Sequence, residues 1–135
     1  MQTVLEVKQV TKQYGQQYAL DHVSLSIQKG EIYGLIGKNG AGKTTLLKTI
    51  SRLIHANSGT VSVFGSQNSK EWNEALRKVG TVIETPVAYN QMTAYQNLNY
   101  YCKVHQIAQP DQLIKETLAY VGLSNTGKRN SATFR

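Results

Sequence analysis

The feature that most constrains this chain is an eight-residue segment, residues 37–44, with the sequence Gly-Lys-Asn-Gly-Ala-Gly-Lys-Thr. It matches the phosphate-binding loop pattern G-x-x-x-x-G-K-[ST]. Glycines at these positions let backbone N–H groups close around phosphate oxygens with no Cβ in the way. Lys43 supplies a point charge to the β and γ phosphates, and the Thr44 hydroxyl is a ligand for Mg²⁺. The segment therefore predicts a site for a nucleoside triphosphate.

The flanking residues have the pattern that this mechanism needs. Residues 31–36, Glu-Ile-Tyr-Gly-Leu-Ile, are typical of a buried strand, and Thr45–Ile50 is typical of the start of a helix. A strand, a glycine turn and a helix N-terminus together make an anion site, which disfavours the alternative of a glycine-rich turn without a ligand. The predicted nucleotide-binding residues of this segment are Gly37, Lys38, Asn39, Gly40, Ala41, Gly42, Lys43, Thr44 and Thr45.

Length and composition narrow the class of protein. The 135 residues fit one domain or part of a larger one. The net charge is +7, but the basic residues are scattered and not interleaved with base-stacking aromatics, so no nucleic-acid partner is expected. No apolar run approaches the roughly 20 residues of a membrane span, and no secretory signal pattern is present, so we expect a cytoplasmic location. The single Cys102 excludes an internal disulfide and indicates a small apolar residue on a helix.

The first part of the chain is rich in strand signals. Two-residue alternation predicts strands that lead into the phosphate loop, and short apolar runs predict further strands after it. The predicted strands are residues 4–10, 23–27, 31–36, 60–65 and 79–83. Glycines at 15, 30 and 59 mark turns, and residues 72–78 have a helical pattern.

The last third is helical. Thr93 and Gln96 have the spacing of a capping box, which predicts a helix that runs to about residue 105. Pro110 suits the first turn of a second helix, which Gly122 ends. Residues 124–135 are polar and without periodicity, which is typical of a loop or a frayed tail.

The phosphate loop, the strands before it and the later spacing resemble the ATP-binding subunit of ATP-binding-cassette transporters over the whole chain. The resemblance implies an α/β P-loop nucleoside triphosphatase fold with an N-terminal antiparallel β subdomain, truncated in the helical subdomain. Residues 1–135 would then be a partial cassette domain, with a nucleotide-binding core portion at 1–88 and the start of the helical subdomain and a tail at 89–135. In this family an aromatic residue upstream of the loop stacks on adenine, and Tyr14 stands at the matching place; the alternative is an exposed turn tyrosine.

Residue 84 departs from the family pattern. The family has a glutamine here that touches Mg²⁺ and the attacking water, whereas this chain has Glu84 followed by Thr85-Pro86. A carboxylate is a harder and more strongly charged ligand for Mg²⁺ than an amide. This glutamate, together with residues 89–98, is similar to exporters of bacitracin and lantibiotic type, which move antimicrobial peptides. Thr44 and Glu84 are the predicted Mg²⁺ ligands; a solvated carboxylate, or the acidic ligand of the second nucleotide motif, are alternatives for Glu84.

The resemblance also implies partners and limits. A subunit of this family couples ATP binding and hydrolysis to transport by a transmembrane permease subunit. It pairs with a second ATP-binding subunit, here as a homodimer, and lies peripherally on the inner face of the cell membrane. The family's signature sequence, its apolar strand ending in Asp-Glu and its switch histidine have no match in these 135 residues. No catalytic set is complete, so we expect this chain to bind ATP and Mg²⁺ without efficient hydrolysis.

Two other classes compete with this interpretation. One is a non-catalytic nucleotide-binding fragment, and the other is a soluble cassette protein that acts on nucleic acid or ribosomes. In the family, the strand before the phosphate loop lies beside strands supplied by the second half of the domain. We therefore expect uncovered apolar faces and open sheet edges in the isolated chain, which promote self-association.

Overall fold

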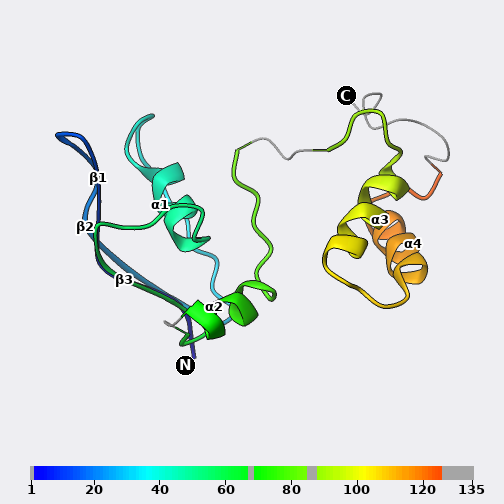
Figure 1. The fold of residues 1–135 in the computed structure, drawn as a ribbon, viewed down its shortest axis with the longest axis horizontal. Helices are drawn as coiled ribbons and strands as arrows, with labels where there is room; N and C mark the ends of the chain where they lie inside the picture. Colours follow the sequence, from blue (N-terminus) through cyan, green and yellow to red (C-terminus); the bar gives the residue numbers. More distant parts are fainter. Residues whose placement is uncertain (1, 67–68, 85–87, 126–135) are drawn as a thin grey trace. The chain divides into compact units, whose positions relative to one another are not determined.

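The computed structural model describes residues 2–66, 69–84 and 88–125 (Figure 1). The chain divides into two compact units, Met1–Thr85 and Pro86–Arg135. The elements follow one another as β1 (Thr3–Tyr14), β2 (Gln17–Gln28), α1 (Lys43–Ile50), β3 (Ser58–Val63), α2 (Ser69–Leu76), α3 (Ala94–Val104) and α4 (Pro110–Tyr120). Within the described ranges, no helix is long and apolar enough to cross a membrane.

The first unit contains an antiparallel sheet in the order β2-β1-β3. Alternation of apolar and polar residues makes β1 a strand, and it pairs on both sides, with Val7 opposite Leu25 of β2 and Val61 of β3. Gly15 takes a positive φ of 57° in the turn between β1 and β2, a conformation that glycine adopts without steric cost. The predicted antiparallel β subdomain is therefore confirmed.

Helix α1 packs on one face of this sheet. Its buried Leu46 joins Val7 and Val10 of β1 and Leu20 of β2 in one hydrophobic cluster. Burial of large aliphatic side chains contributes about 1.5–3 kcal/mol each. The side chains that hold α1 to the sheet therefore also fix the position of the loop that precedes it.

Helix α2 forms a second cluster at the end of β3. Trp72 and Ala75 of α2 are buried against Val63. The helix begins at Ser69 and ends at Leu76, which lies within two or three residues of the predicted 72–78.

The second unit is a helical pair, as the sequence predicts. Thr93 caps α3: its hydroxyl accepts from the Gln96 N–H, and the Gln96 side chain accepts from the Thr93 N–H, which confirms the capping box. Pro110 stands at the start of α4. The buried Cys102 of α3 packs with Ile114 and Leu118 of α4.

A side-chain hydrogen bond also links the two helices of this unit. The Tyr95 hydroxyl donates to the Asp111 carboxylate. This bond, together with partial desolvation, raises the pKa of Tyr95 above its ordinary value.

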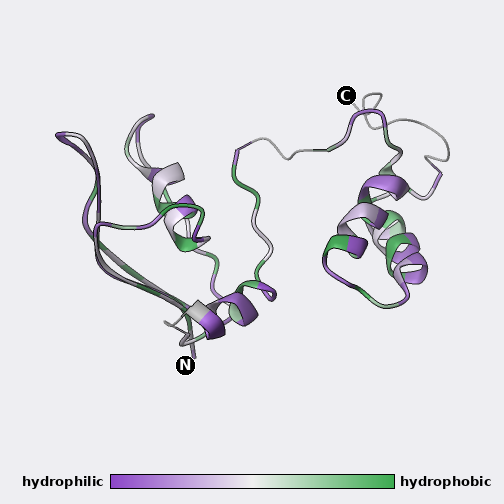
Figure 2. Cartoon of the chain, viewed as in Figure 1, coloured by the Kyte–Doolittle hydropathy of each residue, from purple (hydrophilic) through white to green (hydrophobic). Residues whose placement is uncertain are grey.

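The predicted strands at 31–36 and 79–83 are wrong, since both segments are irregular coil in the structure. An apolar run predicts burial, but a strand also needs a neighbouring strand to accept and donate its backbone hydrogen bonds. The described residues place no partner beside either segment. Ile32 and Ile36 are 99% and 97% exposed and Val82 is 72% exposed. Figure 2 shows the hydrophobic colouring of the coil that follows α2.

The predicted turn at 57–59 is correct only at Asn57, which is a bend, because β3 already begins at Ser58. Gly59 lies inside β3, where a Cβ would come within 2.3 Å of the Gln9 carbonyl oxygen of β1. Gln9 sits where the pairing of β1 and β3 shifts register. The glycine therefore serves a close backbone approach in the sheet, and the chain turns before β3, within residues 51–57.

We predict that the chain self-associates through its exposed coil. Replacing Ile32 and Ile36 together by Ser should reduce association, because two almost fully exposed aliphatic side chains are removed from the surface. Light scattering as a function of concentration measures this, with the mass of the double variant approaching the monomer value of 15.0 kDa. A Tyr120→Ser variant, changed at a 92% exposed position on α4, is the control. Wild-type protein that stays monomeric at every concentration would contradict the prediction.

Candidate nucleotide-binding site

The phosphate-loop sequence forms a turn that leads directly into α1. Gly40 and Gly42 take φ values of 83° and 82°, and Gly42 is the N-cap residue of the helix. The first helical hydrogen bond runs from the Leu46 N–H to the Gly42 carbonyl. No side chain caps the helix, and no acidic residue stands in its first turn. The N-terminal N–H groups and the positive end of the helix dipole therefore face an acceptor site with no competing carboxylate in that turn.

Gly42 also touches the sheet. A Cβ at this position would lie 2.1 Å from the carbonyl oxygen of Ala19 in β2. Only a glycine permits this approach in a left-handed conformation. The backbone of β2 therefore packs directly against the point where the loop ends and α1 begins.

Lys43 reaches back across the loop. Its Nζ donates to the carbonyl oxygens of Gly37, at 2.6 Å, and Lys38, at 2.8 Å. An ammonium group has three donor hydrogens, so one further acceptor can be bound after these two. The charge of Lys43 is thereby fixed at the loop that the sequence pattern assigns to phosphate.

A hollow of about 260 Å³ lies over this loop. It is lined by Ala19, Asn39, Gly40, Ala41, Gly42, Lys43, Thr44 and Thr45. Gly37 and Lys38 do not line it but contribute the two carbonyls that hold Lys43. The structure therefore brings all nine predicted residues of the loop and helix start together in one place.

Tyr14 lies at the end of β1, at the turn into β2. It pairs with Gln17, two residues before Ala19, so it belongs to the end of the hairpin that approaches the phosphate loop. The residue is 53% exposed, and the Lys12 ammonium lies over its ring, 5.1 Å from the ring centre. Cation–π contact with Lys12 orients the ring and covers one of its two faces.

Glu84 lies beside α1. Its Oε1 accepts from the Lys48 Nζ at 2.8 Å, and its side chain is 62% exposed. Lys48 follows Thr44 by four residues and so lies on the same face of α1, one turn farther along. The ion pair therefore ties the carboxylate to the helix whose N-terminus carries Thr44.

The donors present fit a magnesium ion that is bound mainly through nucleotide and water. Mg²⁺ commonly uses one or two protein oxygens together with substrate phosphates and several waters. Thr44 and Glu84 offer a hydroxyl and a carboxylate on and beside α1. Among the described residues, no cluster of three or more acidic, histidine or cysteine side chains forms a metal site without a nucleotide.

Comparison with known proteins identifies the family. The model of the ABC transporter family matches residues 20–134, which include the phosphate loop, α1 and both helices of the second unit. The chain belongs to this family. A solved ATP-binding subunit of an ABC transporter superposes with a TM-score of 0.81 at 28% identity, covering 98% of this chain and 56% of that one. The P-loop α/β fold class predicted from the sequence is thus confirmed.

Two curated ABC transporter relatives also match. The bacitracin transport ATP-binding protein BcrA of Bacillus licheniformis is 37% identical over 129 residues, which are 96% of this chain and 42% of that protein. The lantibiotic transport ATP-binding protein SrtF of Streptococcus pyogenes is 35% identical over 127 residues, 93% of this chain and 53% of that protein. The chain spans about half the length of these relatives. The predicted resemblance to bacitracin and lantibiotic transport subunits is confirmed.

Sequence reasoning missed two residues of this ABC site. Ala19 lines the hollow, and its carbonyl oxygen lies against Gly42. The residues around Ala19 form no recognisable sequence motif, so no signal pointed to it. Lys48 holds Glu84, and its spacing of one helical turn from Thr44 is a signal that could have pointed to it.

The two left-handed glycines make a matched test of the loop. Gly42→Ala should destabilise the fold by about 1–3 kcal/mol more than Gly40→Ala. Both alanines carry the left-handed strain of about 1–2 kcal/mol, but only the first meets the Ala19 carbonyl and forces a backbone shift. Chemical denaturation measures both variants. Equal losses would show that the loop does not rest on β2 as described.

Proposed function

We propose that this chain is the nucleotide-binding part of an ABC transporter ATP-binding subunit and binds Mg-ATP at residues 37–45. The observation that carries the proposal is the loop geometry. Two left-handed glycines, the ammonium of Lys43 held by the Gly37 and Lys38 carbonyls, and the uncapped start of α1 converge on one hollow. Backbone N–H donors at a helix start, together with one positive charge beside the same hollow, favour a triphosphate.

Magnesium bound with the nucleotide would be held by Thr44 and Glu84. The ion supplies charge neutralisation at the phosphates. Lys48 restrains Glu84 beside α1, and Tyr14 offers the ring face opposite Lys12 to adenine. Stacking of this kind tolerates other bases, so the selectivity for adenine over guanine is modest.

The class of transported molecule follows from the relatives. BcrA and SrtF are named for bacitracin and lantibiotic transport, and this chain shares the Glu84-Thr85-Pro86 sequence expected of such exporters. We infer a full-length subunit that drives export of antimicrobial peptides. It would act on the inner face of the membrane, with a transmembrane permease and a second copy of itself.

Loss of the Lys43 ammonium should weaken nucleotide binding strongly. Lys43→Ala is expected to weaken binding of a fluorescent ATP analogue by about 10- to 100-fold, because a charge-assisted contact to phosphate disappears. Lys115→Ala, which removes the same charge from α4 in the other unit, is the control and should bind as the wild type does. Unchanged affinity in Lys43→Ala would refute the assignment of the phosphate loop.

The role of Tyr14 is tested by base stacking. Tyr14→Ala should weaken ATP by about 5- to 150-fold, the range of one lost base–aromatic contact, whereas Tyr14→Phe should bind like the wild type because the ring is retained. Tyr18→Ala, an equally exposed tyrosine of β2, serves as the comparison. Binding of inorganic triphosphate should be the same in all of them, and an effect of Tyr14→Ala on triphosphate alone would contradict stacking.

A further inference from the structure

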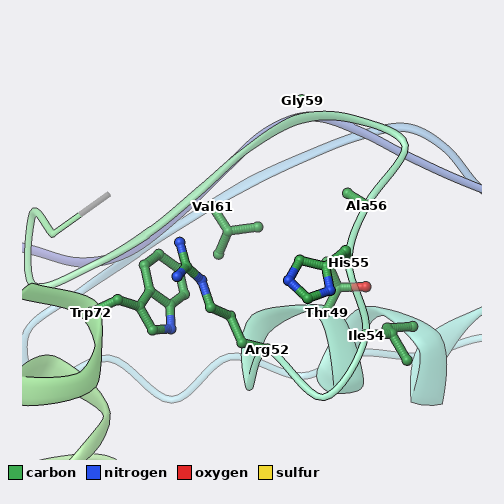
Figure 3. Close-up of a pocket in the computed structure, with 8 residues that line it drawn as sticks. All are labelled: Thr49, Arg52, Ile54, His55, Ala56, Gly59, Val61 and Trp72. Atoms are coloured by element: carbon green, nitrogen blue, oxygen red, sulfur yellow. The ribbon is translucent and has the colours of Figure 1, made fainter. Parts of the chain in front are cut away.

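A second hollow lies at the other end of α1, away from the phosphate loop. It has a volume of about 250 Å³ and is bounded by the end of α1, the chain that follows it, β3 and α2. Figure 3 shows Arg52 and His55 from the segment after α1, Val61 from β3 and Trp72 from α2 around it. All of these residues belong to the first unit.

Part of the wall is apolar. Val61, Ile54 and Ala56 line the hollow together with the indole ring of Trp72. The Arg52 guanidinium stacks on this indole, 4.4 Å from the ring centre. An engineered apolar cavity of about 150 Å³ accepts benzene, so this hollow has room for a ring that carries a small substituent.

The indole N–H of Trp72 gives an independent observation. Trp72 is 1% exposed, and its Nε1 has no hydrogen-bond partner among the described residues. A buried donor without an acceptor is costly and uncommon. Trp72 lines the hollow, and in Figure 3 the nitrogen edge of its ring faces the side from which Arg52 comes.

The other polar groups around the hollow are also donors or can become so. Arg52 has only donors, and the exposed imidazole of His55 can donate from either ring nitrogen. The Thr49 hydroxyl already donates to the Thr45 carbonyl. None of the described residues that line the hollow is an aspartate or a glutamate. The hollow therefore combines hydrogen-bond donors and the charge of Arg52 with apolar walls. This combination favours an anion that carries an apolar group.

We propose that this hollow, defined by Arg52, His55, Val61 and Trp72, is a binding site for a small aromatic or apolar carboxylate. The carboxylate accepts from the Trp72 indole N–H and pairs with the Arg52 guanidinium, and the apolar part of the ligand packs on Val61. A planar guanidinium recognises a carboxylate by its fork of donors. Inorganic anions would lack the apolar contact, and neutral aromatic molecules would lack the charge.

The site goes beyond nucleotide binding and does not depend on it. Its lining residues and those of the phosphate-loop hollow have no member in common. The two hollows lie at opposite ends of α1, joined by the Thr49-to-Thr45 hydrogen bond within that helix.

The single tryptophan makes the test direct, because Trp72 is the only indole in the chain. Benzoate is titrated into the ¹⁵N-labelled full chain while the indole N–H resonance and the tryptophan fluorescence are followed. We expect one saturable shift of the indole resonance with a Kd below about 1 mM, a level that nine non-hydrogen atoms reach at ordinary ligand efficiency. Benzyl alcohol and inorganic phosphate, the neutral and the non-aromatic probes, should each bind at least about tenfold more weakly.

Substitutions at Arg52 and His55 test which side chains contact the ligand. Arg52→Gln should weaken benzoate at least about tenfold, whereas Arg77→Gln, at an exposed arginine just past α2 that does not line the hollow, should leave it unchanged. Should Arg52→Gln unfold the unit, His55→Ala at an exposed position gives the second reading, with about threefold weaker binding. The proposal is overturned by the absence of a saturable indole shift up to 10-fold above the expected Kd of about 1 mM. It is equally overturned if benzyl alcohol or phosphate binds as well as benzoate does.

Discussion

The structure of the first unit depends on the packing of α1 against the β1–β2 hairpin. Leu46 enters the cluster of Val7, Val10 and Leu20, and Gly42 sets the helix start on the Ala19 carbonyl. Burial of these side chains is non-directional and would tolerate a rotation of the helix. The Gly42 contact is specific, because any side chain at this position would clash with the Ala19 carbonyl oxygen. The two together fix both the distance and the rotation of α1, and therefore the direction of its N-terminal N–H groups.

The same helix organises the polar chemistry around it. At the start of α1, the Lys43 ammonium donates to the carbonyl oxygens of the phosphate loop. Farther along the helix, Lys48 forms an ion pair with Glu84. Just after the helix ends, the Arg52 guanidinium stacks on the Trp72 ring. The Lys48–Glu84 pair is largely solvated, so it adds at most about 1 kcal/mol to stability. Its importance is positional, since it holds the Glu84 carboxylate beside the helix that follows the phosphate loop.

The sequence predicts the local features well and the long-range ones poorly. The capping box of Thr93 is confirmed because it needs only its own backbone and Gln96. The phosphate loop forms for a similar reason, because it needs only glycines with positive φ and the contacts of Lys43 with nearby carbonyls. The strands at 31–36 and 79–83 are not formed, because the described residues place no partner strand beside them. The apolar pattern of a segment does not show whether such a partner is present. The second hollow was missed because Arg52 and Trp72 are 20 residues apart and share no motif.

Gly59 limits where the chain can gain or lose residues without disturbing the sheet. It is opposite the register shift at Gln9, where a side chain of any other residue would collide with the β1 backbone. Sliding β3 by one residue would bring Ser58 or Thr60 to that point, so β3 is locked in alignment with β1. An insertion or deletion between α1 and β3 must then be absorbed by residues 51–57. These residues include Arg52 and His55, so a change of loop length would alter the mouth of the second hollow while the sheet stayed in place.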